Sequence, residues 1–155
     1  MIPLRMIRNL EFLLVSMNLR QGHDEEKFPG DLAALVQELK DRAHKTLKEL
    51  TITVMVFRKD VHPQLSTCHG WTMLDDVLGN GSPALRKIHI CVDSDADNIG
   101  TPDAGKQLDF LVSQRLPRLS ERGVLSTGYG RIADIFTNSR PISCLPHISA
   151  VMACD

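Results

Sequence analysis

The sequence predicts an α/β fold in which a parallel sheet of three to four strands carries helices on one face. The main observation is an apolar spacing that occurs three times, an aliphatic residue followed by apolar positions at +3, +5 and +7. Its second positions are Leu10, Leu50 and Ile88, which lie 40 and then 38 residues apart. A regular period of this size is typical of stacked supersecondary units. The expected order of strand and helix, repeated three times, favours parallel pairing through right-handed crossovers.

Three strands are expected, over residues 10–17, 50–56 and 87–92. The second strand is rich in β-branched residues, which suit a pleated surface. Its alternation places Leu50 and Ile52 on one face, and Thr51 and Thr53 on the other. Since sheets covered on both faces usually have continuously apolar strands, these threonines and His89 predict one covered face and one open face.

A first helix is expected after the first strand, with Asp31 as its N-cap. Its inner side carries Leu32, Leu35, Val36, Leu39 and Ala43 at helical spacing. Polar residues from Gln37 to Arg42, Lys40 among them, form the solvated side.

Two further helices are expected. One carries the stripe Trp71, Leu74, Val77 and Leu78 and ends in the glycine- and proline-containing segment 79–83. The only tryptophan, Trp71, is interpreted as a core residue. The other helix covers residues 103–122, and Pro117 should kink or split it because proline removes a hydrogen bond and clashes with the preceding turn. Gly123 is its expected C-terminal cap. Residues 1–125 thus form the α/β domain, and 126–155 an irregular tail with at most a short strand over 132–136.

The composition excludes several classes of function. With 43% hydrophobic residues and a net charge of −1, the chain suits one domain and offers no basic surface for nucleic acid. No apolar run reaches the 18 residues that a membrane span needs. The four cysteines lack zinc-ribbon spacing, so they predict either disulfides or, in preference, reduced thiols in a cytoplasmic or nuclear protein. No metal or cofactor is expected.

Three segments carry a resemblance to a known family. They are Trp71-x-x-Leu74-Asp75-x-x-Leu78, Ala84-Leu85-Arg86-Lys87-Ile88, and Leu116-Pro117-x-Leu119-x-x-Arg122-Gly123-Val124-Leu125. Together with the LxxLxL spacing at Leu47 and Leu85, they resemble the C-terminal leucine-rich-repeat-like region of fungal F-box proteins of the mushroom type. The resemblance covers residues 5–125. It implies the substrate-recognition part of a ubiquitin-ligase subunit, or a degenerate relative, without the F-box itself. The Asn or Cys that usually follows the strand unit is missing, because Met17, Phe57 and Asp93 stand there.

The functional hypothesis is a non-catalytic protein-interaction module whose open sheet face binds a protein partner. An open, partly apolar face of this kind usually marks a partner surface. The candidate binding residues are those expected to point away from the helices, Glu11, Leu13, Thr51, Thr53, Met55, His89 and Cys91. Cover of this face by the tail or by further repeats is the competing interpretation.

Two alternatives remain at this point. Asp93 and Asp95 follow an apolar strand, as in Mg²⁺-dependent phosphatases of the haloacid-dehalogenase type, where the first aspartate attacks phosphorus and the second transfers the proton. The same loop lacks the glycine and the bidentate glutamate of an EF-hand, so a solvated turn is preferred to a calcium site. The chain is otherwise expected to be a fragment that self-associates through its sheet edge.

Overall fold

A computed structural model describes residues 10–19, 27–41, 45–56, 64–94, 101–130 and 149–153. Within these ranges the chain forms one all-parallel, five-stranded sheet in the order β4-β3-β2-β1-β5. The strands are β1 (Phe12–Leu19), β2 (Glu49–Val56), β3 (Lys87–Ser94), β4 (Leu125–Gly130) and β5 (Ser149–Ala153). The predicted α/β class is therefore confirmed, with the three expected strands as parallel neighbours.

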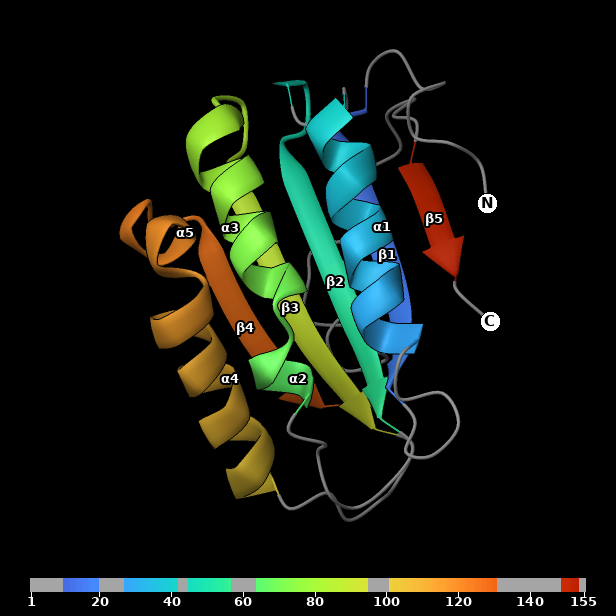
Figure 1. Cartoon of the computed structure of the whole chain (residues 1–155), viewed down its shortest axis with the longest axis vertical. Helices are drawn as coiled ribbons and strands as arrows, with labels where there is room; N and C mark the ends of the chain where they lie inside the picture. The colour runs from blue at the N-terminus through green and yellow to red at the C-terminus, as the bar shows by residue number, and fades with distance from the viewer. Residues whose placement is uncertain are drawn as a thin grey trace.

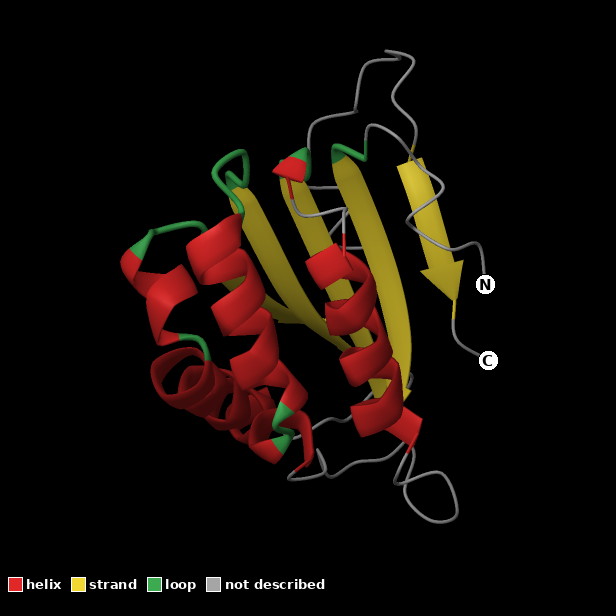
Figure 2. Ribbon diagram, turned by 45° about the horizontal axis from the view of Figure 1, so that its top comes forward, coloured by secondary structure: helices red, strands yellow, loops and turns green. Residues whose placement is uncertain are grey.

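The helices all lie on one side of this sheet (Figures 1 and 2). They are α1 (Lys27–Asp41), α2 (Gln64–Thr67), α3 (Gly70–Gly81), α4 (Thr101–Arg115) and α5 (Pro117–Glu121). Each connection from β1 to β4 leaves a strand, adds one or more helices to that side, and returns to the adjacent strand. The described elements thus form two layers, as the sequence predicts.

The register of β1 corrects one expectation. Leu13 lies opposite Leu50, and Val15 opposite Ile52, so Leu13 takes the place expected for Leu10. A shift by an odd number of residues exchanges the two faces of a strand. In the first half of β1, the residues on both faces are apolar. In its second half, Ser16 and Asn18 are polar, so the face that carries them is not the one that packs into the core.

Two helix boundaries are determined by a tertiary contact and by a proline. The first helix, α1, begins at Lys27, so Asp31 lies inside it and is not the N-cap. Its earlier start places Phe28 in the core against Trp71, with the ring centroids 6.2 Å apart. At the other end of the domain, α4 stops at Arg115 and α5 begins at Pro117, as expected from proline's missing N–H.

The segment after α5 contains more structure than expected. Gly123 has φ = 67°, which confirms its role as the left-handed residue after a helix. The chain then enters β4, which pairs with β3, while β5 pairs with the opposite edge at β1. The expectation of an irregular tail over 126–155 is thus wrong for these two strands, because backbone pairing formed them without apolar periodicity. The expected strand at 132–136 lies outside the described residues.

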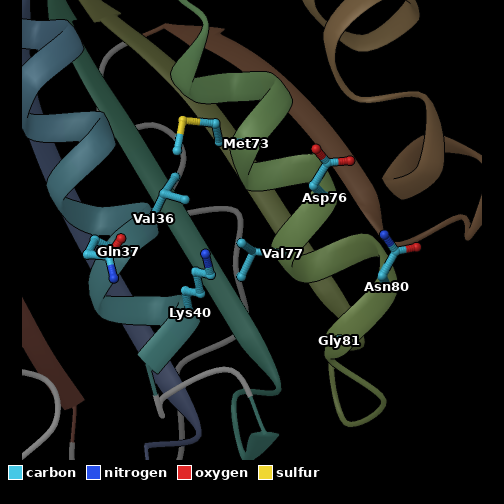
Figure 3. Close-up of a pocket in the computed structure, with 8 residues that line it drawn as sticks. All are labelled: Val36, Gln37, Lys40, Met73, Asp76, Val77, Asn80 and Gly81. Carbon is cyan, nitrogen blue, oxygen red and sulfur yellow. The ribbon is translucent and has the colours of Figure 1, made fainter.

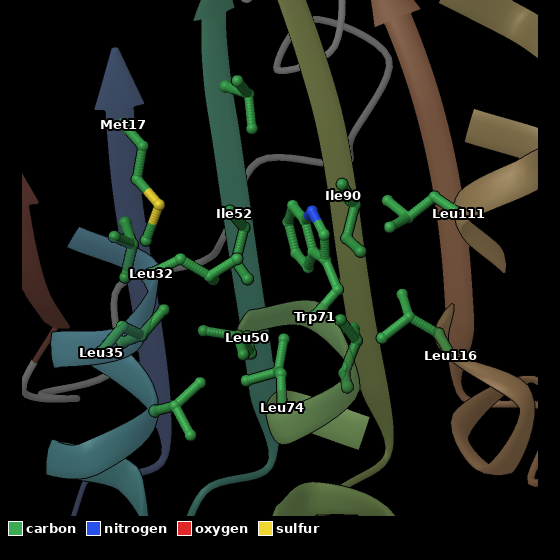
Figure 4. Close-up of a cluster of buried hydrophobic side chains, with 14 of the residues drawn as sticks. Met17, Leu32, Leu35, Leu50, Ile52, Trp71, Leu74, Ile90, Leu111 and Leu116 are labelled. Carbon is green, nitrogen blue, oxygen red and sulfur yellow. The ribbon is translucent and has the colours of Figure 1, made fainter. Parts of the chain in front are cut away.

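The hydrophobic core fills the space between the sheet and the helices (Figure 4). Trp71 is fully buried, as predicted, and its Nε1–H donates to the carbonyl oxygen of Leu65 at 2.6 Å. That bond satisfies the one polar atom that the indole brings into the core. The side chains of β2 and β3 that face the helices, Leu50, Ile52, Val54, Ile88, Ile90 and Val92, are all buried.

Candidate functional site

The sheet face opposite the helices is less open than the sequence predicts. Thr53 is 4% exposed and Cys91 is 2% exposed, so the centre of this face is buried. Leu13 is 2% exposed and belongs to the core on the helix side, which follows from the register of β1. The prediction that these three residues form an accessible binding surface is therefore wrong.

The remaining predicted binding residues are partly exposed but do not form one patch. Thr51, Met55 and His89 lie on this sheet face around the buried centre. Glu11 precedes β1 and pairs with Lys48, with Oε1 and Nζ 2.7 Å apart. These residues thus surround a sheet face that is buried at its centre. The alternation of the strands predicted which residues lie on this face, but it did not predict that the centre is buried.

A His–Ser pair joins β3 to β4 on the same face. His89 Nδ1 lies 2.8 Å from Ser126 Oγ, and the Ser126 hydroxyl donates to the carbonyl of Ile88 at 3.3 Å. The hydroxyl and the ring nitrogen share one hydrogen bond, whose direction follows the tautomer of His89. Its Nε2 is buried beside Gly128 and has no hydrogen-bond partner within the described part of the chain. Burial, with a smaller contribution from Lys87, lowers the pKa of His89.

The acidic loop considered for catalysis is only partly described. Asp93 lies near the C-terminal end of β3, where chemistry collects in open α/β sheets. Asp95 and Asp97 lie outside the described residues. Within the described ranges, no group of three or more His, Cys, Asp or Glu residues is arranged to hold a metal ion.

The opposite side of the molecule has a groove between α1 and α3. Its volume is about 500 Å³, and it is lined by Val36, Gln37, Lys40, Met73, Asp76, Val77, Asn80 and Gly81. Figure 3 shows Val36 and Lys40 pointing toward Met73 and Val77 from the facing helix. The groove therefore has an apolar floor, with polar side chains along its rim.

Met73 gives this groove an exposed apolar side chain. It is 39% exposed, and among the described residues only it and Phe110 are large hydrophobic side chains exposed to this degree. Phe110 belongs to α4 and does not line the groove. An exposed methionine beside two valines is the kind of adaptable apolar surface that protein-binding sites use.

The two helices are held in place at both ends of α3. At its start, Gly70 lets α1 approach so closely that a Cβ at this position would lie 2.8 Å from Leu32 Cγ. Along its length, the buried carboxylate of Asp75 accepts the backbone N–H groups of Arg118 and Leu119, at 3.2 and 2.9 Å. This carboxylate caps α5, whose own N-cap position holds Leu116 and cannot do so.

The C-terminal end of α3 is fastened by Arg122. Its guanidinium donates to the carbonyl oxygens of Leu78 at 2.7 Å and of Ser82 at 3.0 Å. The segments 71–78 and 116–125 thus bind to each other through hydrogen bonds between side chains and helix ends. The wall of the groove formed by α3 is consequently fastened to α5 and to the segment that follows it.

The rim of the groove carries one cation that pairs with no carboxylate among the described residues. Asp76 pairs with Arg118, and Gln37 Nε2 donates to Asp41 Oδ1 at 3.0 Å. Lys40 is exposed and forms no ion pair within the described ranges, and its ammonium points into the groove (Figure 3). The sequence pattern predicts Lys40 on the solvated side of α1, but nothing local to either helix shows that Lys40 and Met73 face each other.

The fold and this groove define an α/β protein with a parallel sheet covered on one side by helices. No family model matches the chain, and neither a curated protein nor a solved structure matches it. In the ranges that the structure describes, none of the helices has the length and hydropathy to cross a membrane.

Proposed function

We propose that this chain is a non-catalytic protein-interaction module and that the groove between α1 and α3 holds a short segment of a partner protein. The observation that carries the proposal is the exposed, apolar floor of the groove, centred on Met73, between two helices that are firmly attached to the rest of the domain. Laying an apolar side chain of a partner into a groove between helices is a recurring mode of peptide recognition.

The resemblance to the substrate-recognition region of F-box proteins supports the same class of function, with the site moved from the sheet face to the helix face. Residues 73–81 extend the groove about 12 Å along α3, at 1.5 Å per residue. That length suits two turns of helix or a few extended residues. Cys68 and Cys91 are free and buried, which suits a cytoplasmic or nuclear location.

The proposal can be tested by selecting a displayed library of random twelve-residue peptides on the full chain. We expect bound peptides to lose affinity for Met73→Glu by about tenfold or more, since a carboxylate in the floor opposes apolar burial. Phe110→Glu is the matched control, because Phe110 is the other large hydrophobic side chain exposed to this degree among the described residues, and it lies outside the groove. Equal loss in both variants, or equal binding by both, would contradict the proposal.

A further inference from the structure

The side chains of the groove also indicate which partner sequence fits it. We propose, building on the function proposed above, that the bound segment is a short amphipathic helix. It places one large apolar side chain on the Met73 floor and an Asp or Glu, three or four residues away, on Lys40.

The first step concerns the charge. Of the charged side chains that line the groove, Asp76 already has a partner in Arg118, with which it forms a surface ion pair. Lys40 is the only other one, and it pairs with no carboxylate of the described residues. A partner that enters the groove therefore meets one uncompensated positive charge. Charge complementarity of this kind selects partners and their register more than it adds affinity.

The second step concerns the spacing. Val36 and Lys40 are four residues apart on α1, which places them one helical turn, about 6 Å, apart along the groove. Figure 3 shows Val36 near Met73, and Lys40 near Val77. In a partner helix that lies along the groove, residues three or four positions apart are separated by about the same distance. Its apolar anchor over Val36 and Met73 is then matched by a carboxylate at i+3 or i+4, on the side of Lys40.

The third step concerns the apolar anchor. Met73 has an unbranched, flexible side chain that can adjust to different partners. Val36 lies beside it and is itself buried in the core, so this part of the floor is fixed from below. The groove volume of about 500 Å³ exceeds what one side chain of the partner needs.

The experiment uses the same twelve-residue peptide library, selected separately on the full chain and on its Lys40→Glu variant. We expect peptides from the unaltered chain to combine a large apolar residue with Asp or Glu three or four positions away. Lys40→Glu should weaken the binding of these peptides about fivefold or more. Peptides selected on the Lys40→Glu variant should carry Lys or Arg at the same spacing. Lys106→Glu, an exposed charge reversal on α4, is the matched control and should leave binding unchanged.

The outcomes separate this inference from the proposed function. If Met73→Glu abolishes binding but Lys40→Glu changes neither affinity nor peptide charge, the groove binds proteins and the acidic-helix inference is wrong. If Met73→Glu has no effect, both are wrong. Binding of the acidic peptides should also weaken as salt is raised, since the pair lies at the surface. Salt-independent binding would contradict the ion pair.

Discussion

The carboxylate of Asp75 in α3 accepts the backbone N–H of Leu119 in α5 at 2.9 Å, although the two residues are 44 positions apart in the chain. The same carboxylate also accepts the N–H of Arg118. A side chain from one helix thus caps another helix, which lacks a capping residue of its own. This contact attaches the last helix of the domain to the helix that forms one wall of the groove.

We expect Asp75→Ala to lower the free energy of unfolding by about 3 kcal/mol, because two helical N–H groups lose a charged acceptor in a buried position. Urea denaturation monitored by Trp71 fluorescence measures the change. The matched control is Asp76→Ala. Its exposed pair with Arg118 should be worth about 1 kcal/mol or less. Similar losses in the two variants would show that Asp75 does not act as a buried cap.

Gly70→Ala should destabilise the protein by about 1–3 kcal/mol, because the new Cβ would lie within 3 Å of two atoms of the buried Leu32 side chain. In contrast, a Cβ at Gly30 in α1 meets nothing within 4 Å. Gly30→Ala should therefore be neutral or stabilising by about 0.5–1 kcal/mol. Thermal or urea unfolding of both variants tests the contact, and a neutral Gly70→Ala would show that α1 and α3 do not approach closely there.

The Cys91 thiol should be unreactive in the folded protein. Burial, and to a lesser degree the charge of Asp93, raises its pKa to about 11, so little thiolate exists near neutral pH. In a Cys144→Ser, Cys154→Ser background, we expect a thiol reagent to label Cys91 only after denaturant is added. Mass spectrometry of the labelled peptide identifies the site. Rapid labelling of Cys91 in the native state would contradict the covered sheet face.

The stability of the protein should fall as the pH is lowered below about 6.5. The folded pKa of His89 is lower than that value, its ordinary one in an unfolded chain. The unfolded state therefore binds the proton first, and the stability due to neutral His89 is lost between the unfolded and the folded pKa. His89→Gln should remove part of this dependence in urea titrations from pH 7.5 to 5.5. His69→Gln, at an exposed position, should leave it in place.

Much of the architecture could be predicted from local patterns. The strands β2 and β3 alternate clearly between apolar and polar residues, and Pro117 separates α4 from α5 because it has no N–H with which to continue the first helix. In β1 the pattern was ambiguous, since Phe12, Leu13, Leu14 and Val15 are all apolar, and the shift in register exchanged its faces. The segment of β4 has no apolar alternation and that of β5 is a short apolar run without alternation, so only their backbone pairing with β3 and β1 identifies them as strands.

The candidate site could not be predicted from the sequence for a different reason. Lys40 and Met73 belong to separate helices, and only the packing of α1 on α3 brings them together in one groove. The sequence by itself determined that the segments of β1, β2 and β3 become parallel strands with helices between them, because periodicity and turn residues act over a few positions. Tertiary structure alone decided the register of the first strand, the cover on the outer sheet face and the location of the groove. These depend on contacts between residues that are far apart in the chain.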